Sequence, residues 1–113
     1  KRFTGSGTAP TSLDFITEPD LGRLRAEREA EDQRILDWIN GLSAETLEGR
    51  FTYTTVTDLR TVSQRLAPAL DHFFNHQTHH RGQAHAALTA LGRPSPVLDL
   101  IYFQRNEKGR EFA

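Results

Sequence analysis

The sequence predicts an all-α domain with two long helices and one short extended segment. Apolar residues recur at the spacing of one helix face between residues 62 and 91, and with polar interruptions between residues 18 and 42. A single β-branched and aromatic run over residues 51–56 interrupts this helical pattern. A length of 113 residues fits one small domain, so residues 1–113 are expected to form a single domain.

The N-terminal part is predicted to be a loop followed by the first long helix. Residues 1–17 are rich in Thr, Ser, Gly and Pro, which favours a loop. The helix is predicted over residues 18–41, with Thr17 as its N-cap. Its apolar stripe is interrupted by Arg28 and Asp32, four residues apart on the inward line. They form either an ion pair at the edge of a bundle or a polar pair that faces a functional pocket.

The second half of the chain is predicted to contain the extended segment and two helices. Residues 51–56 alternate β-branched and aromatic side chains, which is typical of one short strand. A long helix is predicted over residues 60–91, and Pro68 marks either a kink or a later start. Gly92 suits the position after a helix end. A last short helix is predicted over residues 97–104.

Two histidines four residues apart, His76 and His80, are the most informative feature of the chain. On a helix they stand one turn apart on one face, here in the middle of the apolar stripe. Two imidazoles so placed can bind one transition-metal ion. The same helical phase predicts that His76 and His80 are buried or face a pocket. It places His79 and His85 toward solvent or a partner chain, and His72 near the edge of the stripe.

Other interpretations of the pair are open. The two rings can be core residues, each satisfied by one hydrogen bond, or the five histidines can form a solvated tract that binds metal weakly. In a solvated tract, there would be no reason for His76 and His80 to fall on the same helix face as the apolar residues. A zinc protease is excluded, because Gln77 stands where His-Glu-x-x-His chemistry needs a glutamate as general base. Arg81 and Gln83 flank the stripe and are candidates for orienting the ligand rings.

The composition of the chain limits which partners and which cellular compartment are expected. The net charge of −1, without a basic stripe, gives no reason to expect nucleic-acid binding. The absence of Cys fits a reducing cytoplasm and leaves no thiolate nucleophile in the chain. No apolar run reaches the length of a membrane span, so no membrane partner is expected. The helices carry more apolar surface than two helices can bury together, so we expect a homodimer that covers Phe73, Phe74 or Trp38.

Several segments together carry a family resemblance. Residues 75–85 (Asn-His-Gln-Thr-His-His-Arg-Gly-Gln-Ala-His), 88–92 and 99–103 resemble the C-terminal half of the DinB/YfiT family of metal-dependent proteins. The likeness extends back through residues 23–42 and 2–5, so it covers essentially the whole chain. Its most specific element is His-x-x-x-His-Arg-Gly-Gln in a helical context.

The resemblance implies a four-helix, up-down-down-up bundle that is often dimeric. It also implies a divalent metal such as zinc or nickel, held by three histidines of which the second and third match His76 and His80. Family members of known activity are S-transferases that use bacterial low-molecular-weight thiols, and thiol-dependent isomerases. The function implied is therefore a metal-dependent thiol S-transferase acting on an electrophilic small molecule. The alternative is a non-catalytic helical module for interaction or small-molecule binding, with a degenerate metal site.

The sequence departs from the family pattern at the first metal ligand. That histidine lies upstream of the segment matching residues 2–5, and no residue here occupies its position. We therefore expect either a chain that lacks the first two helices or a naturally short member. In a short member, His72, Asp32 or a residue of another chain must substitute. Two imidazoles plus water make a weak, exchangeable site, so low metal occupancy is expected.

Overall fold

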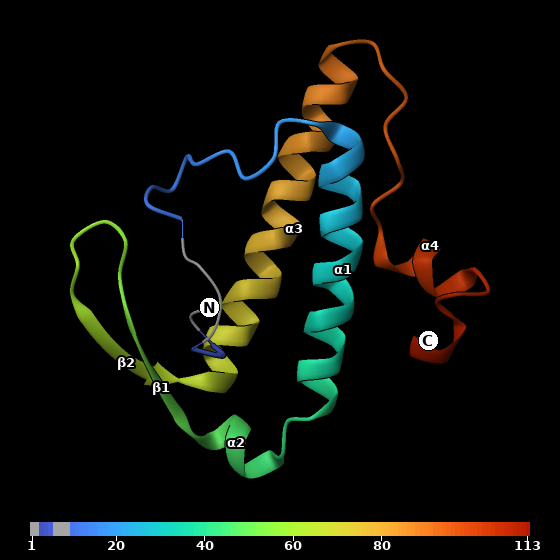
Figure 1. Cartoon of the computed structure of the whole chain (residues 1–113). Coiled ribbons are helices and arrows are strands. Elements are labelled where there is room, and N and C mark those ends of the chain that lie inside the picture. Colours follow the sequence, from blue (N-terminus) through green and yellow to red (C-terminus); the bar gives the residue numbers. More distant parts are fainter. Residues whose placement is uncertain (1–2, 6–9) are drawn as a thin grey trace. The chain divides into compact units, whose positions relative to one another are not determined.

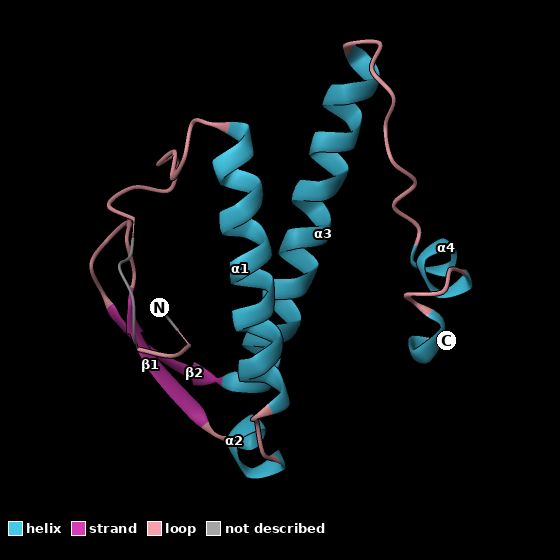
Figure 2. Cartoon of the chain, turned by 45° about the vertical axis from the view of Figure 1, so that its right-hand side comes forward, coloured by secondary structure: helices cyan, strands magenta, loops and turns pink. Residues whose placement is uncertain are grey.

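A computed structural model describes residues 3–5 and 10–113 of the chain (Figure 1). Two compact units make up the chain, residues 1–69 and residues 70–113. Helices account for most of the ordered elements, and one β-hairpin accompanies them (Figure 2). Of the loop predicted over residues 1–17, residues 1–2 and 6–9 lie outside the described part, and the others form neither helix nor strand. Among the described residues, no helix combines the length and apolar character needed to cross a bilayer.

Helix α1 spans Leu21–Asn40, so it begins three residues later than predicted. Its N-cap is Asp20 rather than Thr17, because the Asp20 carboxylate accepts a hydrogen bond from the Arg23 N–H at 2.8 Å. The Glu18 side chain in turn accepts from the Asp20 N–H at 2.9 Å. These two bonds hold the preceding residues outside the helix. No residue of α1 is buried, and charged pairs one turn apart line its surface.

A short helix and a hairpin follow α1. Helix α2, Ala44–Glu48, is capped by the Ser43 hydroxyl, which accepts from the Thr46 N–H at 3.1 Å. Strands β1, Arg50–Thr54, and β2, Thr61–Arg65, pair antiparallel.

The second strand corrects two sequence predictions, the all-α class and the helix start at residue 60. The residues of β2 are exposed and half-buried in alternation, a period-2 pattern that matches the alternation in β1. An unpaired strand would leave its backbone groups without partners, and the five residue pairs of the hairpin supply them. The extended segment predicted over residues 51–56 corresponds to β1, whose last residue is Thr54.

The turn of the hairpin is closed by polar groups around one strained residue. The Thr55 N–H donates to the Arg60 carbonyl at 2.9 Å, and the Arg60 N–H donates to the Thr55 hydroxyl at 2.9 Å. The Asp58 carboxylate accepts from the Thr55 hydroxyl and from the Arg60 guanidinium. Leu59 has a φ of 54°, in the left-handed region that costs a leucine about 1–2 kcal/mol.

Aromatic side chains gather beside the hairpin within the first unit. The rings of Phe51 and Tyr53 stack at 5.3 Å between centroids on the half-buried face of β1. Phe3 contacts Phe51 at 5.0 Å and Trp38 at 5.6 Å. Trp38, one of the side chains that a homodimer was expected to cover, therefore has an aromatic neighbour within its own chain.

Helix α3 spans Leu66–Ala90, and its start explains the proline that follows. Pro68 is the third helical residue, where a missing N–H costs no helical hydrogen bond. The proline thus marks a later start. The buried apolar residues of the described chain lie at this end of α3: Leu66, Ala69 and Leu70.

The C-terminal end of α3 is a Schellman motif. Gly92 has a φ of 63°, its N–H donates to the Thr89 carbonyl at 3.0 Å, and the Arg93 N–H donates to the Leu88 carbonyl at 2.9 Å. Glycine is favoured there because it adopts this conformation without strain.

Helix α4 spans Leu100–Arg105 and starts three residues later than the predicted range 97–104. Pro94 and Pro96 precede it, and proline disfavours helical backbone in the residue before it. A short 3-10 helix, Arg110–Phe112, ends the chain, and the Gln104 amide donates to the Phe112 carbonyl at 2.6 Å.

Candidate metal centre

The two histidines singled out by the sequence meet at their ring nitrogens. His76 and His80 lie on successive turns of α3, and their Nε2 atoms are 3.0 Å apart. The ring centroids are 4.4 Å apart and the rings are nearly perpendicular, at 82°. Each ring therefore directs its outer nitrogen, Nε2, at the other ring.

This convergence fits a shared metal ion. Two nitrogens that bind one ion at about 2.0–2.1 Å are separated by about 2.9 Å in octahedral and about 3.4 Å in tetrahedral coordination. The observed 3.0 Å lies between these values. The rings would need little movement to accept an ion, and imidazole nitrogen is a preferred ligand of zinc and nickel.

A glutamine contacts the back of one ring. His80 Nδ1 is 2.8 Å from Gln83 Oε1, three residues further along the same helix. Histidine ligands of metals commonly make such a bond with their second nitrogen. Arg81, the other flanking candidate, donates instead to the Thr78 hydroxyl at 3.0 Å. Of the two flanking residues, Gln83 is the one with a hydrogen bond to the pair.

Two further histidines surround the pair. His72 stacks on His76 at 5.5 Å between centroids, and His79 lies 6.1 Å from His76 and 5.3 Å from His80. His72 thus presents a ring face to His76. Among the described residues, no group of three or more His, Cys, Asp or Glu side chains is placed to hold one metal ion. The arrangement brings together two candidate ligands, His76 and His80, and one amide that contacts a ring, Gln83.

The expected burial of the pair is wrong for this chain. His76 and His80 are exposed. Of the two histidines expected to face solvent or a partner chain, His79 is exposed and His85 is half-buried. The physical reason is that the buried apolar residues sit at the start of α3, while the stripe around the histidines has little cover. Helical phase predicted which rings meet, but it could not tell how much surface covers them.

The surroundings of His76 favour its neutral form. Partial desolvation, followed by the nearby imidazoles of His80, His72 and His79, lowers the pKa of His76. A histidine binds metal only when its ligating nitrogen is unprotonated. The cluster thus favours the uncharged form of the His76 ring, which a metal ligand requires.

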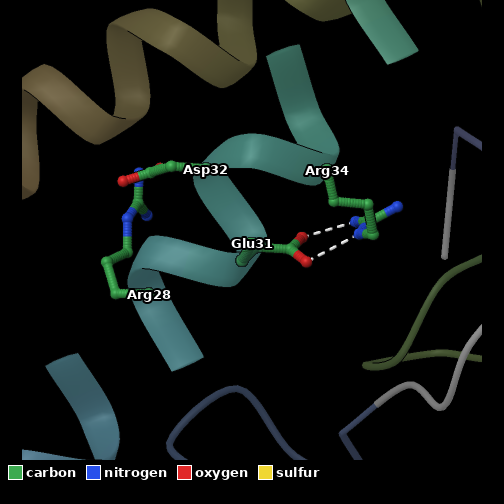
Figure 3. Close-up of polar contacts among 4 residues, drawn as sticks. All are labelled: Arg28, Glu31, Asp32 and Arg34. Atoms are coloured by element: carbon green, nitrogen blue, oxygen red, sulfur yellow. Dashed lines mark hydrogen bonds and ion pairs between the residues drawn. The ribbon is translucent and has the colours of Figure 1, made fainter. Parts of the chain in front are cut away.

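The polar pair on α1 is an ion pair. Arg28 and Asp32 point toward each other from successive turns, and Glu31 pairs with Arg34 on another side of the helix (Figure 3). Side chains of Arg28 and Asp32 are about half exposed, at 52% and 48%. This is the simpler of the two interpretations that the sequence allowed. An exposed ion pair of this kind stabilises a helix by only about 0.3–0.5 kcal/mol.

Comparisons with known proteins agree with the resemblance. Neither a curated protein nor a solved structure matches the sequence. The profile described as the DinB family matches residues 2–111, nearly the full length. The match includes the helix that carries His76, His80 and Gln83. The chain belongs to the DinB family.

Proposed function

We propose that His76 and His80 bind one divalent transition metal, and that the site activates a low-molecular-weight thiol for transfer to an electrophilic small molecule. The observation that carries this proposal is the 3.0 Å approach of the two Nε2 atoms on adjacent turns of α3. Membership of the DinB family supports it, because the family is generally metal-associated and the matched residues include both histidines. We also propose that the helices contribute to an up-down-down-up bundle and to a homodimer.

The roles of the residues follow from their chemistry. A divalent metal held at the pair supplies Lewis acidity, which lowers the pKa of a bound thiol. His76 and His80 bind the ion, and their exposure lets a small thiol approach. These 113 residues contain no cysteine, so the nucleophilic sulfur comes from the cosubstrate. In the transfer a sulfur–carbon bond forms, the leaving group departs with its bonding electrons, and the thiol proton passes to solvent.

A second candidate function is a non-catalytic helical module with a degenerate metal site. It is favoured by one observation, that the described residues bring together two ligands and no third. Two imidazoles completed by water bind metal weakly and exchange it readily. Such a chain would serve as an interaction or small-molecule-binding module.

Metal content and thiol transfer separate the two functions. The protein is purified without chelators or a metal-affinity tag, and its metal is measured by mass spectrometry for the wild type, His76→Ala and His85→Gln. His85→Gln is the matched control, because His85 is on the same helix and outside the ring contacts of the pair. Consumption of small thiols is then followed with a chlorodinitrobenzene reporter.

Stoichiometric metal in the wild type and the control, lost in His76→Ala together with thiol transfer, supports the enzyme. Metal without transfer of any thiol supports the module. A wild-type protein that neither retains nor rebinds metal contradicts both the metal site and the proposed activity.

A further inference from the structure

We propose that Gln83 is a positioning residue that holds the His80 ring in the tautomer whose Nε2 is free to bind metal. This role rests on the proposed function, because it matters only if His80 binds metal. The tautomer of His80 itself, however, is a property of the metal-free protein. The geometry behind it is a row of three groups along one face of α3. His76 Nε2 is 3.0 Å from His80 Nε2, and His80 Nδ1 is 2.8 Å from Gln83 Oε1.

The amide oxygen fixes the hydrogen on one side of the ring. A carbonyl oxygen of glutamine only accepts hydrogen bonds, so the bond at 2.8 Å requires that His80 Nδ1 carries the hydrogen. A neutral imidazole has one N–H, so His80 Nε2 is then a bare lone pair. This bare nitrogen is the one that faces His76. Gln83 thus sets in advance the tautomer that a ligand at this position needs.

The two rings are consequently unequal. Because His80 Nε2 is bare, the hydrogen between the rings belongs to His76 Nε2, which donates to His80. No hydrogen bond joins His76 Nδ1 to another residue in the described part of the chain. To become a ligand, His76 gives its Nε2 proton to solvent and takes one at Nδ1, with no net change in protonation. His80 therefore already has the tautomer that a metal ligand needs, whereas His76 must change its tautomer before it can bind.

The helix itself supplies the spacing. Residues three apart on a helix are neighbours, so Gln83 reaches His80 without help from any other part of the chain. Arg81 cannot take this role, because a guanidinium has no acceptor for an imidazole N–H. The Arg81 guanidinium donates instead to the Thr78 hydroxyl, at 3.0 Å. The positioning role is accordingly assigned to one side chain.

Nitrogen NMR of the histidine rings in the metal-free protein tests the proposal directly. Two-bond proton–nitrogen correlations at a pH of about 8, well above the ordinary histidine pKa, distinguish a protonated from a bare ring nitrogen. The His80 signals are assigned by their loss in His80→Asn. The variants are Gln83→Leu, which removes the acceptor, and Gln83→Glu, which keeps one. Arg81→Gln is the control, since it breaks the neighbouring bond to Thr78 and leaves the His80 contact intact.

The wild type, Gln83→Glu and Arg81→Gln are expected to show His80 with a protonated Nδ1 and a bare Nε2. Gln83→Leu is expected to lose this preference while its helical circular dichroism is retained, because Gln83 is exposed. Zinc affinity should fall about tenfold in Gln83→Leu, at the low end of the roughly 10–100-fold cost of losing an orienting partner. Gln83→Glu should bind zinc at least as tightly as the wild type.

The outcomes for Gln83 and for the metal site are separable. An unchanged His80 tautomer in Gln83→Leu, or a wild type with Nε2 protonated, overturns the positioning role even if zinc binds through His76. A tautomer that depends on Gln83 in a protein that binds no zinc upholds the positioning claim and removes the proposed function.

Discussion

Replacing Gly82 by alanine should stabilise the protein. Gly82 lies within α3, between His80 and Gln83. Apart from its chain neighbours and the backbone of its own helical turns, no heavy atom of the described residues is within 4 Å of a Cβ built there. Alanine therefore adds no clash, and it is about 1 kcal/mol more favourable than glycine inside a helix. For a chain of this size that corresponds to a rise in Tm of roughly 3–6 °C. Thermal unfolding followed by far-ultraviolet circular dichroism measures it.

Gly92→Ala is the matched control, with the opposite sign. Gly92 has a φ of 63°, and a side chain there costs about 1–2 kcal/mol, so the Tm should fall. If Gly82→Ala lowers the Tm instead, a neighbouring surface must press on that turn, and the open environment inferred for it is refuted. Such a surface would agree with the usual reason for a mid-helix glycine, which is the close approach of another helix.

Three further outcomes are expected. Leu59→Gly should raise the free energy of unfolding by about 0.5–1 kcal/mol in chemical denaturation, because Leu59 is 77% exposed and is strained at a φ of 54°. A lower free energy of unfolding would contradict the strain at that turn. Because the pKa of His76 is lowered by partial desolvation and by the neighbouring imidazoles, its ring stays unprotonated to a lower pH than an ordinary histidine. A proton NMR titration of the metal-free protein should show this, and a His76 ring that protonates at or above the ordinary histidine pKa would contradict it. Light scattering should give a homodimer that Phe74→Ser weakens, since Phe74 is 45% exposed on α3; a stable wild-type monomer would count against it.

Much of the helical content and the contact between the His76 and His80 rings could be predicted from the spacing of nearby residues along the chain. The i, i+4 spacing of His76 and His80 sets their separation once the backbone is helical, whatever surrounds it. The i, i+3 spacing of His80 and Gln83 works in the same way. Gln83 was a candidate because it flanks the apolar stripe, and this spacing is what brings its amide to His80. These features depend on one element alone.

The features that the sequence did not reveal depend on contacts between distant residues. Strand β2 is a strand because it pairs with β1, and its Val62 also fits the apolar period of a helix. That ambiguity extended the predicted helix backward to residue 60. The N-cap is Asp20 and not the predicted Thr17, because the Asp20 carboxylate accepts a hydrogen bond from the free Arg23 N–H in the first turn of α1. Burial of the histidines could not be predicted either, because it depends on which surfaces cover α3.

Zinc titration of a double-mutant cycle at the pair tests the central claim most directly. Calorimetry compares the wild type, His76→Ala, His80→Ala, the double variant and the His85→Gln control. If both Nε2 atoms bind one ion, one zinc binds per chain, each single substitution removes almost all affinity, and the double substitution removes little more. His85→Gln should bind within a few-fold of the wild type. Single variants that bind as tightly as the wild type, or a control that weakens as much as they do, would contradict a metal site built on His76 and His80.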